Sequence, residues 1–199
     1  MAEDRPLRAD ARRNRALLLQ VAKTAFASDG LSVPLDEIAR RAGVGPGTLY
    51  RHFPTKEALF EAVVHERLRQ LVDDARALRS ADDAGAALLG FIDRLVAEAA
   101  AKRDLVDALA GADIDITTTV AATAADLRSE IGHLLVRAQR CNTIRSDIGI
   151  ADLMAIVSGI LSAVQPRFND RADPERVLAV LHDGLQATPR DRGGRDQRE

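Results

Sequence analysis

The chain has 199 residues, of which 46% are hydrophobic and 29% are charged, with a formal net charge of −2. These values are typical of a soluble globular protein with one or two domains and argue against a disordered or membrane-embedded chain. Five Phe, one Tyr and no Trp disfavour a β-sandwich or barrel, whereas apolar residues at helical spacing predict an all-α fold.

The single Cys141 excludes an internal disulfide framework. No run approaches the roughly 20 apolar residues that a membrane span needs, and no signal-peptide pattern opens the chain. We therefore expect a cytoplasmic protein without a membrane partner.

The first part of the chain is basic. Residues 1–60 hold ten Lys and Arg against seven Asp and Glu, which leaves +3 there and −5 in the remainder. Residues 1–9 are polar and contain Arg5 and Arg8, so we expect a flexible basic arm. Apolar positions that follow at helical spacing predict a long helix ending near Gly30.

Residues 35–60 predict two short helices across a glycine turn. Apolar residues recur at helical spacing up to Ala42, and Gly43 stands where helices commonly end in a left-handed residue. Pro46 suits the first turn of the next helix, which can run only to about Phe53 because Pro54 follows. This pattern is typical of a helix-turn-helix, which places its second helix in the major groove of DNA.

The second short helix has two different faces. Leu49 and Phe53 are four residues apart and should face inward, while Thr48, Arg51 and His52 share another face. Arg51 is the best candidate for reading a base, because a guanidinium matches the acceptor pair of guanine.

The run Gly-Thr-Leu-Tyr-Arg-His-Phe-Pro-Thr-Lys-Glu-Ala-Leu-Phe from Gly47 is the most recognisable part of a wider resemblance. Residues 10–60 resemble the DNA-binding domain of the TetR family of bacterial transcriptional regulators. The resemblance implies an all-helical protein with a DNA-binding domain and a second domain that dimerises and binds a small molecule. It also implies phosphate contacts from Thr48, Tyr50, His52 and Lys56, and an approach to the bases by Gly47, Thr48 and Arg51.

The sequence departs from the family at 44–46, where many members carry a hydroxyl residue and a lysine but this chain has Val-Gly-Pro. Several residues also have a structural interpretation. The ring of Tyr50 could pack against the domain core, and His52 could be an ordinary surface residue. Arg40 and Arg41 fit a solvated helix face as well as a DNA contact, and the arm at 1–9 either touches DNA or is only a basic tail.

The remaining apolar pattern predicts further helices, for a total of about nine. The expected segments are 56–78, 88–99, a short helix around 105–109, 120–138, 153–164 and 174–185, with a connection at 141–149. We divide the chain into an arm at 1–9, a DNA-binding domain at 10–57, a helical effector-binding and dimerisation domain at 58–188 and a disordered tail at 189–199.

On the helix predicted at 120–138, polar side chains fall opposite the apolar stripe. These are Asp126, Glu130, His133 and Arg137. We therefore expect His133 to be exposed to solvent and not to serve as a metal ligand or a pocket base.

The last two predicted helices carry wide apolar stripes. Either the stripes are consumed by the core of a single chain, or, as the family resemblance implies, they pack on a second copy as a four-helix bundle. The residues predicted for that dimer interface are Leu153, Ile156, Val157, Ile160, Leu161, Val177, Leu178, Leu181 and Leu185.

Three residues at the edges of apolar stripes are candidates for lining an effector pocket: Phe91, Thr117 and Thr123. Each also fits a plain core or surface position. Because few aromatic or charged groups are available inside the body, we expect an apolar or weakly polar effector.

We find no catalytic constellation, no metal-ligand cluster and no cofactor motif in the sequence, so no enzyme activity is predicted. The function predicted is a ligand-responsive, sequence-specific transcriptional repressor that binds double-stranded DNA as a homodimer on a palindromic operator. The alternative is a dimeric small-molecule binding protein with little DNA affinity, and an enzyme in the helical body is a more remote one.

Overall fold

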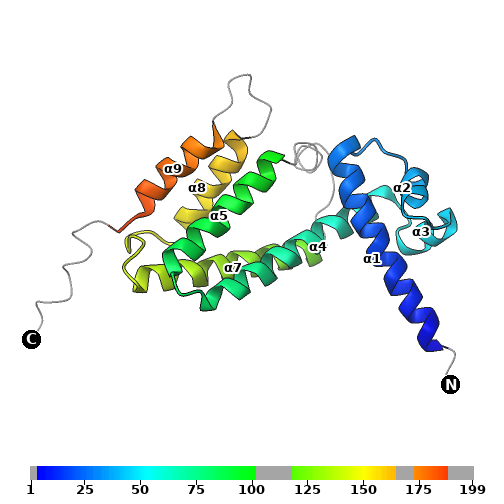
Figure 1. Cartoon of the computed structure of the whole chain (residues 1–199), viewed down its shortest axis with the longest axis horizontal. Coiled ribbons are helices and arrows are strands. Elements are labelled where there is room, and N and C mark those ends of the chain that lie inside the picture. Colours follow the sequence, from blue (N-terminus) through cyan, green and yellow to red (C-terminus); the bar gives the residue numbers. More distant parts are fainter. Residues whose placement is uncertain (1–3, 102–117, 165–172, 188–199) are drawn as a thin grey trace, which may run out of the picture. The chain divides into compact units, whose positions relative to one another are not determined.

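The computed structural model describes residues 4–101, 118–164 and 173–187. These residues form α-helices and one short 3-10 helix, η1, and no β-strand is found among them, which confirms the all-α prediction (Figure 1). The elements are α1 (Asp4–Asp29), α2 (Leu35–Arg41), α3 (Pro46–His52), α4 (Lys56–Ala77), η1 (Leu78–Ser80), α5 (Ala84–Ala101), α7 (Thr118–Arg140), α8 (Ile150–Ala163) and α9 (Pro174–Leu185).

Several predicted segments fall outside the described residues. These are the short helix around 105–109, the first three residues of the arm and the tail at 189–199. The rest of the predicted arm differs from expectation, because α1 begins at Asp4 and residues 4–9 are helical. One reason lies in the sequence: Arg, Leu and Ala favour a helix, and an ion pair between Arg13 and Asp10 supports the turns that follow.

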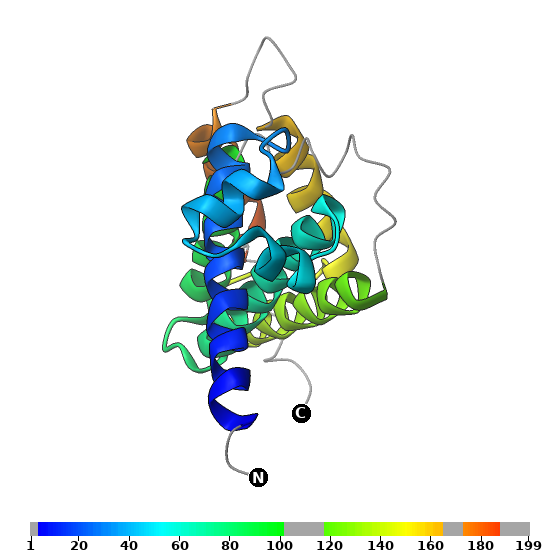
Figure 2. The ribbon, with the colours of Figure 1, turned by 90° about the vertical axis from the view of Figure 1, so that its right-hand side faces the viewer.

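The chain divides into two compact units, and the division falls inside α4, after Arg67. The first unit holds α1, α2, α3 and the beginning of α4, and Figures 1 and 2 show α2 and α3 lying against α1 near its C-terminal end. Its core is closed by Phe26 of α1 and Phe60 of α4, whose rings meet edge to face with centroids 5.7 Å apart.

The turn between α2 and α3 is a Schellman motif. Gly43 has a φ of 65°, which confirms the predicted left-handed residue. Its N–H donates to the Arg40 carbonyl at 3.1 Å, and the N–H of Val44 donates to the Ala39 carbonyl at 3.1 Å. The motif satisfies the last carbonyls of α2 and sets the direction in which the chain enters α3.

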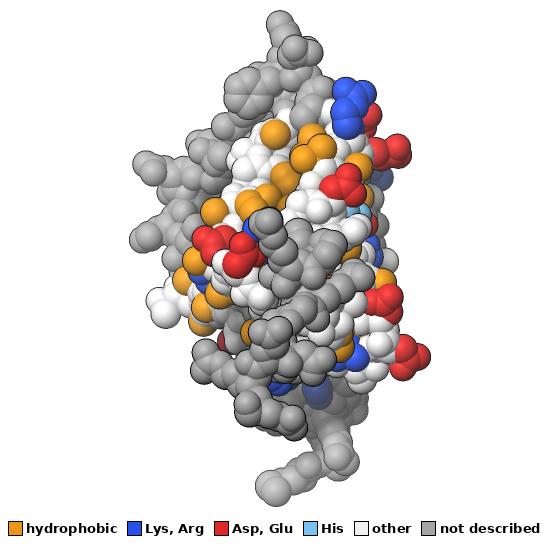
Figure 3. All heavy atoms as spheres, turned by 90° about the vertical axis from the view of Figure 1, so that its left-hand side faces the viewer, with side chains coloured by type: hydrophobic (Ala, Val, Ile, Leu, Met, Phe, Trp, Pro, Cys, Tyr) orange, Lys and Arg blue, Asp and Glu red, His pale blue; other side chains and the backbone are white. Residues whose placement is uncertain are grey.

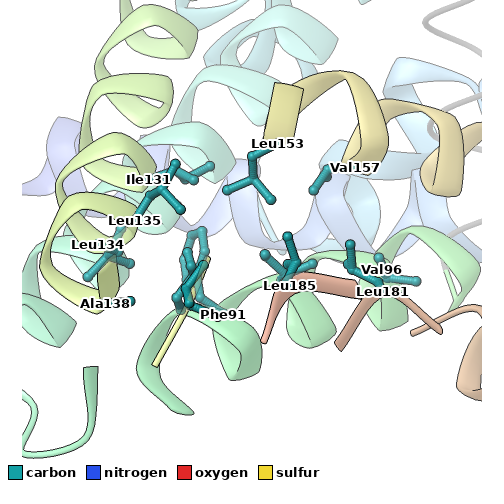
Figure 4. Packing of buried hydrophobic residues seen from close by; sticks show 14 of the residues in the cluster. Phe91, Val96, Ile131, Leu134, Leu135, Ala138, Leu153, Val157, Leu181 and Leu185 are labelled. Carbon is teal, nitrogen blue, oxygen red and sulfur yellow. The ribbon is translucent and has the colours of Figure 1, made fainter. Parts of the chain in front are cut away.

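The second unit holds the rest of α4 with η1, α5, α8, α9 and α7 from Ala122 onward. Helix α5 packs on both α8 and α9, which lie beside it in Figure 1. Side chains from α5, α7, α8 and α9 meet in one core, shown in Figure 4, with Phe91, Leu134 and Leu153 each at most 1% exposed.

A charged cluster joins the end of α4 to α7 within this unit. Glu130 was predicted on the polar face of its helix, but that expectation was wrong, because the residue is 5% exposed. Its Oε1 lies 3.0 Å from Arg76 Nε and its Oε2 lies 2.6 Å from Arg79 Nη2. His133 is exposed, as predicted, and its Nδ1 contacts Arg79.

Burial alone would raise the pKa of Glu130. The hydrogen bond from Arg76 and the positive charges of Arg79, Arg76 and His133 outweigh burial, and the pKa is lowered. The carboxylate therefore stays ionised inside the unit, and the cluster fixes the end of α4 against α7. Arg137 adds a further link, since its Nη2 donates to the Ala81 carbonyl just after η1.

Candidate nucleic-acid interface

Helix α3 is anchored by one face and open on the other. Leu49 is fully buried and Phe53, its C-cap, is 2% exposed, so both apolar residues face inward as predicted. Gly47 and Arg51 are exposed and Thr48 is half-buried. Arg51 forms no hydrogen bond or ion pair with any other described residue, so its guanidinium is available to a ligand.

The entry to α3 lacks a side-chain cap. Gly45 occupies the N-cap with φ −66° and ψ 146°, and Pro46 takes the first helical position. Adding a Cβ at Gly45 or Gly47 would meet no atom within 4 Å. Both glycines therefore present open backbone at the surface beside the exposed face of α3.

Tyr50 lies at the surface with 45% of its area exposed. The alternative prediction, that its ring packs in the domain core, is therefore wrong. The negative charge of Asp36, together with desolvation and a hydrogen bond to that carboxylate, raises the pKa of the hydroxyl. This pair could not be read from the sequence, because the 13 residues between Asp36 and Tyr50 carry no spacing signal.

His52 and Lys56 are less open than Arg51. His52 is half-buried and borders a hollow of about 250 Å³ together with Phe53 and residues of α1 and α4, including Arg15 and His65. The Nζ of Lys56 donates to the carbonyl of Leu31 at 2.9 Å. The ammonium has three donors, so one contact leaves two for another acceptor.

Arg40 and Arg41 are engaged by acidic neighbours in the same unit. Both guanidiniums contact Glu37, and Arg41 also lies 2.5 Å from Asp29. The hydrogen bonds from Arg40 and Arg41 lower the pKa of Glu37 to about 2. These contacts agree with the interpretation of Arg40 and Arg41 as a solvated, ion-paired face.

Arg15, one of three arginines that the sequence places near the start of the first long helix, lies beside the end of α3. Its guanidinium carbon lies 5.1 Å from the centroid of the Phe53 ring. The arginine thus places a positive charge of α1 next to the C-terminal end of α3 by a cation–π contact.

The predicted dimer residues divide into two groups. Five of them are buried in the core of their own unit, as Figure 4 shows for four: Leu153, Val157, Ile160, Leu181 and Leu185. The apolar stripe on each helix is wide enough to face both the core of its own unit and a second copy. Helix α5 covers the part that was predicted to face the second copy. Leu161, Val177 and Leu178 are half-buried against that core, and Ile156 is 41% exposed.

The exposed apolar surface of α8 and α9 lies elsewhere on the two helices. Val180, which the sequence places in the apolar stripe of the last helix, is 69% exposed, and alanines and glycines lie on the exposed sides of both helices. Figure 3 shows apolar side chains in a row on the side of this unit where α8 and α9 lie. Val180 falls opposite Leu178 and Leu185 on α9, so the stripe on this helix extends round to its exposed side.

Two of the three residues predicted to line an effector pocket lie in the described part of the chain. Phe91 is 1% exposed in the core, with the Arg94 guanidinium 5.6 Å from its ring centroid, and Thr123 is 8% exposed on α7. Thr117 falls outside the described residues. A surface groove of about 480 Å³ on α7 and the start of α8 contains neither Phe91 nor Thr123.

Within the described part of the chain, no helix has the length and apolarity to cross a bilayer. No group of three or more His, Cys, Asp and Glu residues there is arranged to hold a metal ion.

A short helix with an exposed cationic face, held by a buried face and a Schellman turn, defines a helix-turn-helix DNA-binding protein. Two family models identify it further. Residues 18–63 match the bacterial regulatory proteins of the tetR family, and residues 83–187 match the C-terminal domain of SbtR-like transcriptional regulators. The chain belongs to the TetR family of bacterial transcriptional regulators.

Similar proteins agree with this assignment. The TetR transcription regulatory protein from Mycobacterium vanbaalenii is 46% identical with a TM-score of 0.73, over 91% of this chain and 99% of that one. The regulator SCO0520 from Streptomyces coelicolor is 35% identical with a TM-score of 0.70, over 87% and 99%. The HTH-type transcriptional repressor KstR2 of Mycolicibacterium smegmatis is 39% identical over 83 residues, 38% of this chain. The chain matches about two fifths of the length of such curated relatives.

Proposed function

We propose that this protein is a homodimeric, effector-responsive transcriptional repressor that binds a palindromic operator in the cytoplasm. The observation that carries the proposal is the exposed face of α3, where Arg51 has no protein partner among the described residues. A guanidinium held on a short anchored helix can bind the O6 and N7 acceptors of guanine in the major groove.

The other residues of the interface act on the backbone of DNA. Thr48 and Tyr50 offer hydroxyl groups for phosphate oxygens, and Lys56 and His52 offer cationic or N–H donors. Gly47 has no side chain between the helix and the duplex, so it allows close approach to the bases. Such phosphate contacts fix the register of the protein and make its affinity depend on salt.

A second copy is needed because α3 has only seven residues. One such helix makes too few base contacts for tight specific binding, whereas two recognition helices about 34 Å apart can read successive major grooves. We infer that the copies meet through the exposed side of α8 and α9, with Ile156 and Val180 as its large apolar side chains. Leu161, Val177 and Leu178 are half-buried and contribute at the edge.

Repression follows from occupation of a promoter. An effector that binds better to a conformation with misaligned recognition helices shifts the population away from DNA by its difference in affinity for the two states. Helix α4 belongs to both compact units without a break, and so does α7, which crosses from the first unit to the second after Ala121. Such a shift would therefore pass through these two helices.

The proposal is tested by selecting genomic DNA fragments on the purified full-length protein. We expect an enriched palindrome, and Arg51→Ala should weaken binding to it by about 1 to 3 kcal/mol while leaving random DNA little changed. Arg140→Ala removes an exposed positive charge from α7 and serves as the matched control. Failure to retain any DNA at low salt would instead favour a dimeric small-molecule binding protein.

A further inference from the structure

The groove on α7 and the start of α8 combines apolar walls with a cationic edge. Its volume is about 480 Å³, within the range of small-molecule sites. Helix α7 contributes Arg128, Gly132, His133 and Val136, and the connection into α8 contributes Ile148 and Ile150. All of these residues belong to the second compact unit.

Arg128 is a charged residue of this groove without an ion-pair partner among the described residues. It is exposed and makes no hydrogen bond or ion pair with any other residue that the structure describes. The carboxylate of Asp152, close to the groove in sequence, accepts a hydrogen bond from the N–H of the lining residue Gly149 at 2.8 Å. The groove therefore presents a free guanidinium to an incoming ligand.

The walls of the groove are held in place. Gln139 donates from Nε2 to the carbonyls of Arg145 at 3.0 Å and Ile148 at 2.9 Å, which fixes the connection that forms one wall. Gly132 lies close to Ile150 across the groove, since a Cβ there would make a van der Waals contact with that side chain at 3.7 Å. A preformed hollow of this kind lets an apolar ligand bind without first ordering a loop.

We propose that this groove binds an organic anion with an apolar body, of the class of a medium-chain carboxylate. The carboxylate pairs with Arg128, and the chain lies against Val136, Ile148 and Ile150. A charge-assisted pair at the edge of an apolar groove selects an acid over an alcohol or amine of the same length. That such a ligand is the effector rests on the proposed function, whereas its binding does not.

One neighbour of the groove makes the site relevant to the helix that joins the units. His133 borders the groove and contacts Arg79, which in turn pairs with Glu130. An occupant is therefore one side chain away from the cluster that fixes the end of α4.

The test titrates sodium octanoate into the full-length protein by calorimetry, without DNA, with 1-octanol and octylamine as matched ligands. We expect octanoate to bind most tightly, and decanoate to bind roughly tenfold more tightly than octanoate because two more methylenes are buried. Arg128→Gln should weaken octanoate binding about tenfold and leave octanol unchanged. Arg140→Gln, the same change on the exposed side of α7, should bind octanoate as the wild type does.

Gly132→Leu provides a second variant that fills the groove, and it should abolish binding of all three ligands while its circular dichroism spectrum stays helical. Equal affinity for octanoate and octanol, or an undiminished affinity in Arg128→Gln or Gly132→Leu, would overturn the assignment. A gel shift of the unliganded protein with its selected DNA tests the proposed function separately. The ligand assignment and the DNA-binding function can therefore fail independently of each other.

Discussion

Arg76 of α4 and Glu130 of α7 form an asymmetric pair, with Nε and Oε1 3.0 Å apart. The glutamate side chain is 7% exposed, whereas the arginine side chain is 54% exposed. Most of the desolvation penalty therefore falls on the carboxylate. Removing the carboxylate leaves cations that water still solvates, whereas removing the arginines would leave an unpaired carboxylate inside the unit, which costs more.

Glu130→Gln should destabilise the protein by about 1 to 2 kcal/mol at pH 7, because the charge-assisted contacts to Arg76 and Arg79 become neutral ones. The folded-state pKa of Glu130 lies below its ordinary value of 4.5, so the stabilisation is present above pH 4.5. It is lost as the pH falls through the folded-state value. Urea unfolding of both proteins between pH 7 and pH 3 measures this difference.

The control for that experiment is Asp126→Asn, which changes an exposed carboxylate on the same helix. Its effect should stay within about 0.5 kcal/mol. A Glu130→Gln difference that remains constant down to pH 3 would show that the carboxylate does not titrate with folding, and would contradict the role assigned to it.

The buried Glu130 also shows where prediction from sequence ends. Local signals located the turn correctly, because Gly43, Pro46 and Pro54 restrict their own backbone. Glu130 was placed on a solvated face because its neighbours on α7 are polar. Its partners lie more than 50 residues away on α4 and η1, and nothing in the local pattern encodes that pairing.

The apolar stripes of α8 and α9 show a related limit. An apolar side chain such as Leu153 has the same periodicity whether it faces its own core or a second copy. Only the position of α5 distinguishes the two cases. At the DNA interface, the spacing gave the exposed face of α3 but not the contacts of Lys56 with Leu31 or of Tyr50 with Asp36.

Gly85→Ala should destabilise the second unit by about 1 to 3 kcal/mol. A Cβ at this buried position would lie 2.8 Å from both Cβ and Oγ1 of Thr143, which leaves no room for a methyl group. Thermal unfolding measures the effect. Gly90→Ala on the same helix is the control, since nothing lies within 4 Å, and it should stabilise by about 0.5 to 1 kcal/mol. A Gly85→Ala protein as stable as Gly90→Ala would refute the close packing.

Val180→Glu should convert the protein toward monomers at micromolar concentration. The residue is 69% exposed in the single chain, so the substitution should leave the fold intact. Because an isologous interface contains each residue twice, dimerisation should weaken by at least about tenfold. Sedimentation velocity provides the measurement. Leu17→Glu changes an exposed apolar residue of α1 and should sediment as the wild type does. If both variants sedimented alike, the proposed interface on α9 would be wrong.

Lys56→Gln should have two separate effects. Loss of the 2.9 Å hydrogen bond to Leu31 should destabilise the first unit by about 0.5 to 1.5 kcal/mol. Loss of a phosphate contact should weaken binding to all DNA sequences and reduce the slope of log K against log salt by about one. Gel shifts at several salt concentrations test this, with Arg140→Gln as a charge-matched control. If the two variants had equal salt slopes, the assignment of Lys56 as a phosphate contact would be wrong.

The end of α9 is joined by hydrogen bonds to the connection between α7 and α8. Arg145 donates its N–H to the Leu185 carbonyl at 2.9 Å, and Ala187 donates to the Thr143 carbonyl at 3.3 Å. A gene truncated just before codon 186 would convert the Leu185 carbonyl into the terminal carboxylate, remove the hydrogen bond of Ala187 and expose the core next to it. Purification tags and reporter fusions at this end of the chain should therefore be attached downstream of Ala187.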